Sequence, residues 1–168
     1  SSSRAIYGEG KYKCKYHGDT YPNQRNTQDM NNGIFNSQCC NQDLEICATS
    51  EKAKINPISI YGKTKYRQEE IFMQGGDDLK IPAVALRYQN VYGPGQSLSN
   101  PYTGILSIFS TRILNGNHIE IYEDGQQSRD FIYIEDVVDG TICALENDNA
   151  NNEVFNVGSG KSISIFDV

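Results

Sequence analysis

The chain has 168 residues, 38% of them hydrophobic and 21% charged, which suits one globular domain with a sizeable core. Its formal net charge of −6 argues against nucleic acid as a main partner, since no basic stripe accompanies it. No apolar run approaches the roughly 18 residues of a membrane span, and no charged-then-apolar leader is present. The five cysteines, an odd number, argue against a secreted disulfide framework. We therefore expect a cytoplasmic protein without a membrane partner.

The first half of the chain contains two predicted strands and one long predicted helix. Residues 1–7 are predicted to be the end of a buried strand that runs into a turn. Residues 11–55 are polar and aperiodic, so we predict an insertion there without a helix. The spacing predicts a helix over 57–74, capped by Asn56 and ended by the glycine pair that follows it. Residues 82–88 form an apolar run typical of a buried parallel strand.

Shorter helices and strands alternate in the second half of the chain. The predicted elements are a helix over 102–114, strands at 118–122 and 131–134, a helix over 136–145, a strand at 155–157 and an element that begins at Ser162. This alternation indicates an α/β fold built on a doubly wound sheet.

Tyr61 and Lys65 form the most informative pair in the chain. Residues four apart on a helix share a face, so the phenol and the ammonium are expected to lie together. Tyrosine has a reference pKa of about 10 and is a poor base at neutral pH. A fixed positive charge within about 4–6 Å favours the phenolate, which can take a proton from an alcohol. The same spacing also occurs on solvated helix faces, so the pair alone does not identify a site.

Four further blocks accompany this helix in a defined order. They are Ser1–Gly8, Leu86–Gln96, Asp124–Val137 and Val154–Gly160. Together with the Tyr-x-x-x-Lys helix they resemble the C-terminal two-thirds of the extended short-chain dehydrogenase/reductase family, in particular its nucleotide-sugar epimerases.

The resemblance implies a partial Rossmann-like parallel sheet in residues 1–95, interrupted by the insertion at about 11–55, and a smaller substrate-binding region at 96–168. It also implies NAD as cofactor, a nucleotide-diphosphate sugar as substrate and a homodimer in the complete protein. A Gly-rich phosphate loop precedes the Ser block in the family. Because no such loop is present, we expect a fragment of a longer protein.

The resemblance also implies roles for individual residues. Ser3 would hydrogen-bond the sugar hydroxyl, Tyr61 would remove its proton, and Lys65 would hold the nicotinamide ribose. The alternative is a purely structural role for each residue: Ser3 would cap a turn, Asn90 would form a turn and Arg129 would belong to a surface ion pair. The implied catalytic residues are Ser3, Tyr61 and Lys65, the cofactor-binding residues Tyr61, Lys65 and Tyr88, and the substrate-binding residues Ser3, Asn90, Asn100 and Arg129.

The two residues after Ser3 help to choose the reaction. Sugar dehydratases of the family carry an Asp-Glu pair there, whereas this chain has Arg4 and Ala5. Elimination of water is therefore disfavoured, and epimerisation at C4 through a transient 4-keto sugar is favoured. The segment 97–104 and the insertion resemble the dTDP-L-rhamnose 4-epimerase subgroup. The alternatives are a dehydratase or reductase on the same fold, or a non-catalytic nucleotide-sugar-binding relative.

The insertion contains a Cys-x-x-His pair and a Cys-Cys pair, which together resemble a zinc knuckle. The expected ligands of a structural zinc are Cys14, His17 and Cys40. In similar sequences the second pair reads Cys-x-x-Cys, but this chain has Ser37 at the matching position, so Cys39 or Cys47 would have to substitute. The alternative is a loop whose cysteines bind no metal.

Overall fold

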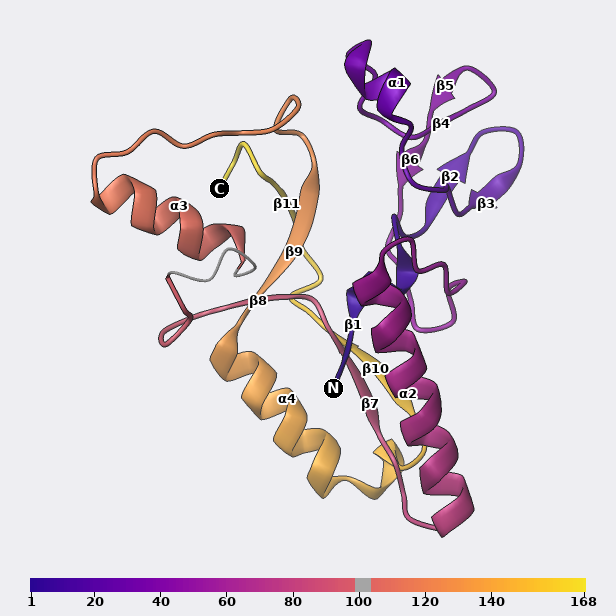
Figure 1. The fold of residues 1–168 in the computed structure, drawn as a ribbon. Helices are drawn as coiled ribbons and strands as arrows, with labels where there is room; N and C mark the ends of the chain where they lie inside the picture. The colour runs from indigo at the N-terminus through magenta and orange to yellow at the C-terminus, as the bar shows by residue number, and fades with distance from the viewer. Residues whose placement is uncertain (99–103) are drawn as a thin grey trace. The chain divides into compact units, whose positions relative to one another are not determined.

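Figure 1 shows the computed structural model of the protein, which describes residues 1–98 and 104–168. Asn100, an expected substrate-binding residue, lies outside the described residues. The chain divides into two compact units, of which unit 1 comprises Ser1–Arg87 and Asn147–Asn156 and unit 2 comprises Tyr88–Glu146 and Val157–Val168. The expected domain division near residue 95 stays a prediction.

The described residues contain α-helices, 3-10 helices (η) and strands. In chain order they are β1 (Ser2–Ser3), η1 (Arg4–Tyr7), β2 (Tyr12–Cys14), β3 (Gly18–Thr20), α1 (Thr27–Asn31), β4 (Gln38–Cys39), β5 (Gln42–Asp43), β6 (Glu45–Ile46), α2 (Ile60–Leu79), β7 (Ala85–Tyr88), β8 (Asn90–Tyr92), α3 (Ile105–Leu114), β9 (Ser128–Tyr133), α4 (Ile134–Glu146), η2 (Asp148–Ala150), β10 (Val154–Val157) and β11 (Ser162–Ser164). No helix in these described ranges is long and apolar enough to cross a membrane.

A parallel sheet with strand order β1-β7-β10 is the centre of unit 1. Between β7 and β10, the Ala85 N–H donates to the Glu153 carbonyl and the Gln89 N–H to the Val157 carbonyl, at 3.1 and 2.9 Å. Both partners advance by the same number of residues, as parallel pairing requires. Ala85 and Leu86 are buried, which explains the uninterrupted apolar run in the sequence. The predicted α/β class is confirmed.

The long helix α2 begins and ends later than the sequence predicted. Its cap is Ser59, whose side chain accepts a hydrogen bond from the Gly62 N–H at 3.0 Å, whereas the Asn56 N–H donates to the Ile6 carbonyl. The helix continues through the glycine pair at its C-terminal end. A Cβ at Gly76 would lie 2.7 Å from the Ala83 Cβ, so close packing accounts for a glycine inside the helix there.

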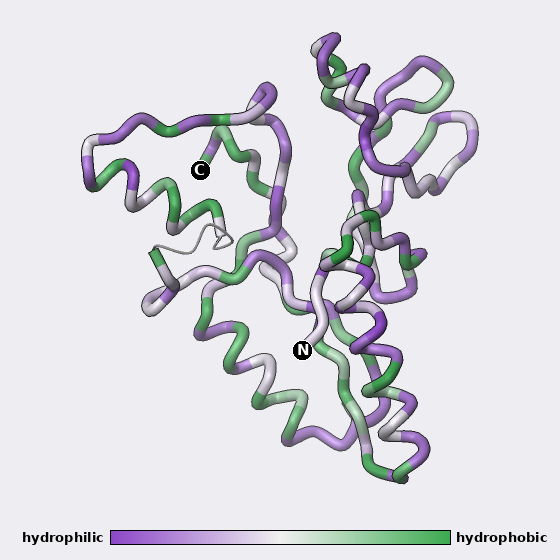
Figure 2. The backbone as a smooth tube through the Cα atoms, viewed as in Figure 1, coloured by the Kyte–Doolittle hydropathy of each residue, from purple (hydrophilic) through white to green (hydrophobic). Residues whose placement is uncertain are grey.

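The insertion is a lobe of short β-hairpins. Strands β3, β2 and β6 form an antiparallel sheet in that order, and β4 pairs with β5. The lobe also contains α1, where no helix was predicted. Asn26 caps α1 by accepting a bond from the Gln28 N–H at 2.8 Å, but α1 is too short to show apolar periodicity. Figure 2 shows that the lobe is largely hydrophilic.

Unit 2 is built on β9. This strand pairs in parallel with β8 and antiparallel with β11, and Phe131 packs with Phe109 of α3 and with Ile165. The strand predicted at 118–122 does not form. Instead, the Arg112 guanidinium donates to the His118 carbonyl at 3.1 Å and Tyr122 is exposed, so the segment is an irregular connection from α3 to β9.

Candidate functional site

Ser3 lies at the end of β1, where the chain turns into η1. Its side-chain oxygen accepts a hydrogen bond from the Ala5 N–H at 3.2 Å, so Ser3 does cap the turn, which is the structural role expected for it as the alternative to substrate binding. A hydroxyl that accepts this bond still has its own proton to donate to a ligand. Capping and substrate binding by Ser3 are therefore compatible.

Tyr61 and Lys65 lie in the first two turns of α2. Tyr61 is 57% exposed and Lys65 is half-buried, so both side chains are accessible. Gly62 brings this end of the helix against η1, because a Cβ on Gly62 would lie only 2.5 Å from the Ala5 carbonyl oxygen. The turn that follows Ser3 and the turn that carries Tyr61 are thus in direct backbone contact within unit 1.

Replacing Gly62 by alanine should separate these two turns. The added Cβ would meet the Ala5 backbone at 2.5 Å and the capping Ser59 hydroxyl at 3.2 Å, so the expected result is a lower midpoint of urea unfolding and a loss of any activity that depends on Tyr61. Gly75→Ala is the matched control in the same helix, because nothing lies within 4 Å of its Cβ position. That change should stabilise the helix by about 0.5–1 kcal/mol. A neutral Gly62→Ala variant would contradict the close packing.

A buried ion pair joins α2 to β7. The Arg87 guanidinium donates to both carboxylate oxygens of Glu69 at 2.5 and 3.1 Å, and both residues are less than a tenth exposed. Arg87 also donates to the Tyr7 hydroxyl at 2.6 Å and to the Glu51 carbonyl at 3.1 Å. Burial lowers the pKa of Arg87, but its bonds to Glu69 and Tyr7 outweigh burial and the net shift is upward. The guanidinium therefore stays charged.

This network fixes the helix face that carries the candidate base. Lys65 lies four residues after Tyr61, and Glu69 lies four residues after Lys65, so the three lie along one face of α2. The Tyr7 hydroxyl in turn donates a hydrogen bond to the Asn156 side-chain oxygen in β10 at 2.9 Å, which extends the network to that strand. Sequence reasoning missed Glu69 and Arg87 as partners. The available signal was an arginine inside an apolar strand, which requires a buried counter-charge.

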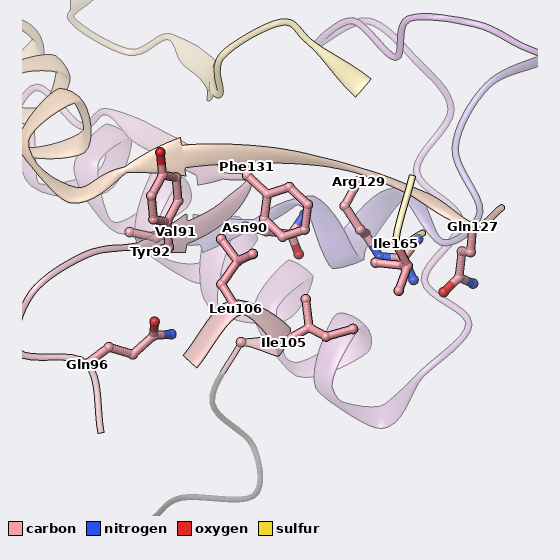
Figure 3. A pocket seen from close by; sticks show the side chains of 11 residues that line it. Asn90, Val91, Tyr92, Gln96, Ile105, Leu106, Gln127, Arg129, Phe131 and Ile165 are labelled. Carbon is pink, nitrogen blue, oxygen red and sulfur yellow. The ribbon is translucent and has the colours of Figure 1, made fainter. Parts of the chain in front are cut away.

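Unit 2 contains a pocket of about 260 Å³ whose lining includes Asn90 and Arg129 (Figure 3). Asn90 lies in β8 and not in a turn, and its side-chain amide donates a hydrogen bond to the Asp130 carbonyl at 2.8 Å. Arg129 lies in β9 and donates to the Ser128 carbonyl at 2.9 Å. Phe131 and Ile105 supply apolar wall. The pocket combines an apolar wall with an amide and a guanidinium.

The lining also includes two side-chain amides that sequence reasoning did not select, Gln96 and Gln127. Glutamine is common on surfaces, and no spacing signal singles these two out. Tyr88, the expected cofactor-binding residue, is half-buried, and its hydroxyl lies 2.9 Å from the Thr141 hydroxyl of α4.

Asp130 organises the loop after β10. Its carboxylate accepts hydrogen bonds from the Ser159 N–H, the Ser159 hydroxyl and the Gly160 N–H at 2.9, 2.8 and 3.0 Å. A Cβ at Gly158 would lie 2.6 Å from an Asp130 carboxylate oxygen. Two of the sequence blocks, at 124–137 and 154–160, therefore meet at one carboxylate next to Arg129.

The expected metal ligands in the insertion are brought together. The ligand atoms of Cys14, His17, Cys39 and Cys40 all lie within 4.8 Å of one another. The Tyr16 backbone N–H is the main reason that the pKa of Cys14 falls to about 6, whereas bonds to Cys14 and Cys40 raise the pKa of Cys39 to about 11. The cluster differs from the three expected ligands by the addition of Cys39.

Residues 38–158 match the NAD dependent epimerase/dehydratase family. The chain is 36% identical over its full 168 residues to the dTDP-L-rhamnose 4-epimerase of Burkholderia thailandensis, and spans 46% of that protein. Its fold matches the UDP-N-acetylglucosamine 4-epimerase of Methanobrevibacter ruminantium, solved with UDP-N-acetylmuramic acid. That match has a TM-score of 0.71 and 32% identity, and covers 98% of this chain and 42% of the other.

A third similarity is to the UDP-glucuronic acid 4-epimerase of Bacillus cereus, solved with UDP-glucuronic acid and NAD. The TM-score is 0.63 at 36% identity, over 73% of this chain and 38% of the other. The chain thus spans less than half the length of these relatives.

Proposed function

Since the chain belongs to the NAD dependent epimerase/dehydratase family, we propose that it forms the catalytic and substrate-binding part of a nucleotide-sugar 4-epimerase that uses NAD. The observation that carries this proposal is the backbone contact between Gly62 and Ala5. It joins the turn that carries the candidate base to the turn that follows Ser3. Both turns belong to unit 1.

Each of the three residues has a role that its chemistry suits. The Ser3 hydroxyl would donate a hydrogen bond to the 4-hydroxyl oxygen of the sugar. Tyr61 would take the 4-hydroxyl proton while the C4 hydrogen leaves as hydride, which gives a 4-keto sugar. Return of hydride to the other face of C4, with the proton from Tyr61, gives the epimer. Lys65, one turn further along α2, would hold the cofactor ribose beside Tyr61.

The residues in unit 1 fit the cofactor. Ser3 lies at the carboxyl end of a parallel strand, the edge at which ligands of open α/β sheets bind. Lys65 on the adjoining helix face is a half-buried donor suited to ribose hydroxyls. NAD, when bound, would accept the C4 hydride and return it, which is chemistry that no side chain supplies.

The residues after Ser3 support epimerisation over dehydration. Arg4 and Ala5 form the start of η1, and neither side chain offers a carboxyl group for moving protons at C5 and C6. A reversible hydride transfer with one general base needs no such group. The pocket of unit 2, with Asn90 and Arg129, would bind the nucleotide diphosphate.

The test is a product analysis with the intact protein, NAD and candidate nucleotide sugars, followed by NMR and mass spectrometry. The expected result is a mixture of two C4 epimers of unchanged mass, without net consumption of coenzyme. A product lighter by one water would show a dehydratase, and stoichiometric oxidation of added reduced coenzyme would show a reductase. Binding without turnover would show a non-catalytic relative. Each of these three outcomes overturns the proposal.

Arg129 provides a prediction for substrate binding. Arg129→Ala should raise the KM for the nucleotide sugar much more than Arg129→Lys, because lysine keeps the charge but loses the planar fork that pairs with phosphate oxygens. Loss of one charge-assisted hydrogen bond corresponds to about 1.5–3 kcal/mol. Arg67→Ala, on an exposed face of α2, is the control and should leave KM unchanged. If nucleoside diphosphate binds Arg129→Ala as tightly as wild type, Arg129 does not belong to the site.

Two further expectations belong to the complete protein. We propose that the complete protein is a homodimer, as the resemblance to the nucleotide-sugar epimerases implies, and that it lies in the cytoplasm. Light scattering of the intact protein measures the first, and fractionation of cells that express it measures the second.

A further inference from the structure

The thiol and imidazole cluster in the insertion has the dimensions of a metal site. The His17 Nδ1 atom lies 3.5, 3.4 and 3.7 Å from the sulfur atoms of Cys14, Cys39 and Cys40, and the sulfurs of Cys39 and Cys40 are 3.8 Å apart. Zinc bonds of about 2.3 Å to sulfur and about 2.0–2.1 Å to nitrogen, at tetrahedral angles, separate two sulfurs by about 3.8 Å and a sulfur from a nitrogen by about 3.6 Å. The observed separations match these values.

Hydrogen bonding does not explain the cluster. One imidazole nitrogen carries either one proton or one lone pair, so it makes one hydrogen bond. Here three sulfur atoms surround the same nitrogen at nearly equal distances. All four ligand atoms are instead placed as they would be around a common central ion.

Two β-hairpins supply the ligands in pairs. Cys14 ends β2 and His17 lies in the turn to β3, whose first residue, Gly18, pairs with Cys14. Cys39 ends β4, and Cys40 lies in the two-residue turn to β5. Cys40 has a φ of +54°, a conformation that non-glycine residues rarely adopt. Asn41, the other residue of this turn, has a φ of +59°, and positive φ at both residues is what a two-residue type I′ hairpin turn requires. The turn places the Cys40 sulfur 3.8 Å from that of Cys39.

The lobe has only a small hydrophobic core. Among residues 11–55, all of which the structure describes, only Cys14, Leu44 and Ala53 are buried. The strands of the lobe are two or three residues long, and α1 buries no residue. Small units with so small a core are commonly held by a metal or by disulfides. The cysteines of this lobe are free thiols.

We propose that Cys14, His17, Cys39 and Cys40 bind one structural Zn²⁺ ion. Three sulfurs and one imidazole nitrogen are soft and borderline ligands that select zinc over magnesium or calcium. Four protein ligands fill a tetrahedral site, so the ion has no open position for substrate and would serve folding. Cys39 thus takes the place that Ser37 leaves empty. The Cys47 sulfur instead lies 3.7 Å from the Glu45 carbonyl oxygen, with which it forms a hydrogen bond.

The first test is elemental analysis of the intact protein purified without chelator. The expected content is about one zinc per chain. Cys39→Ser and Cys14→Ser should each lose most of the metal, whereas Cys47→Ser, a cysteine of the same lobe outside the cluster, should retain it. Metal-free protein, or loss of metal from Cys47→Ser with retention in Cys39→Ser, would overturn the proposal.

A second measurement covers variants that fail to fold. Co²⁺ added to chelator-treated wild-type protein should give the intense visible bands of a tetrahedral site with thiolate ligands, and Zn²⁺ should abolish them. Protease should cleave the lobe faster in the chelated protein and at the original rate after zinc is restored. Absence of cobalt bands, or a disulfide among Cys14, Cys39 and Cys40 in the freshly purified protein, would contradict the site.

Discussion

Tyr61→Phe should lower kcat for epimerisation by about 10²–10⁴, the usual contribution of a positioned general acid or base. The substitution removes one oxygen atom from a side chain that is 57% exposed, so neither the packing of α2 nor the fold should change. Binding of the nucleotide sugar should stay within a few-fold, because the pocket with Asn90 and Arg129 lies in the other unit. The measurement is kcat and KM of the intact protein with its sugar nucleotide.

Tyr122→Phe is the matched control for this experiment. Tyr122 is 76% exposed and lies in the irregular connection before β9, in the unit that does not carry the candidate base. It should keep full activity. Wild-type turnover by Tyr61→Phe would remove Tyr61 from the mechanism, whereas equal loss in both variants would point to a general effect of losing a phenol.

Glu69→Ala should destabilise the protein by about 3–5 kcal/mol, because it leaves the Arg87 guanidinium buried without its counter-charge. Arg87→Ala should lower the stability by a similar amount, because it leaves the buried Glu69 carboxylate without its counter-charge. The double variant Glu69→Leu with Arg87→Met should recover part of the loss, since it removes both charges together. Urea unfolding of Glu69→Leu, Arg87→Met and the double variant, which share the same substitutions, gives the coupling between the two residues.

A surface pair on the same helix is the control. Arg67 and Glu70 also form an ion pair, at 2.8 Å, but their side chains are 77% and 38% exposed. Arg67→Ala should therefore change stability by no more than about 1 kcal/mol. If Glu69→Ala costs as little as Arg67→Ala, the buried network does not hold α2 against β7.

Local patterns predicted most of the secondary structure and left out what depends on tertiary contacts. The apolar run at 82–88 and the helical spacing at 102–114 correspond to β7 and α3, because burial on a sheet or on one face leaves a periodic signal. The end of α2 was misplaced, since glycine at 76 reflects packing against Ala83 and not termination. The strand predicted at 118–122 has suitable residues but forms no strand.

The candidate site shows the same division. Ser3, Tyr61 and Lys65 could be selected because their family motif is local, and their catalytic roles stay predictions. Glu69 and Arg87 are 18 residues apart in sequence, and their pairing follows from the packing of a helix on a strand, which no local motif records. Cys39 was an alternative ligand in the sequence. The two-residue turn that brings its sulfur within 3.8 Å of the Cys40 sulfur follows from the register of the hairpin, which the sequence alone does not give.

The most direct measurement of the proposed chemistry uses a nucleotide sugar that carries deuterium at C4, incubated with the intact protein and NAD in ordinary water. A transient 4-keto sugar formed by hydride transfer predicts that both C4 epimers keep the deuterium at C4, because hydride that stays in the site does not exchange with water. Loss of the label to solvent during epimerisation would mean that C4 is deprotonated instead. That result would contradict the NAD-dependent mechanism.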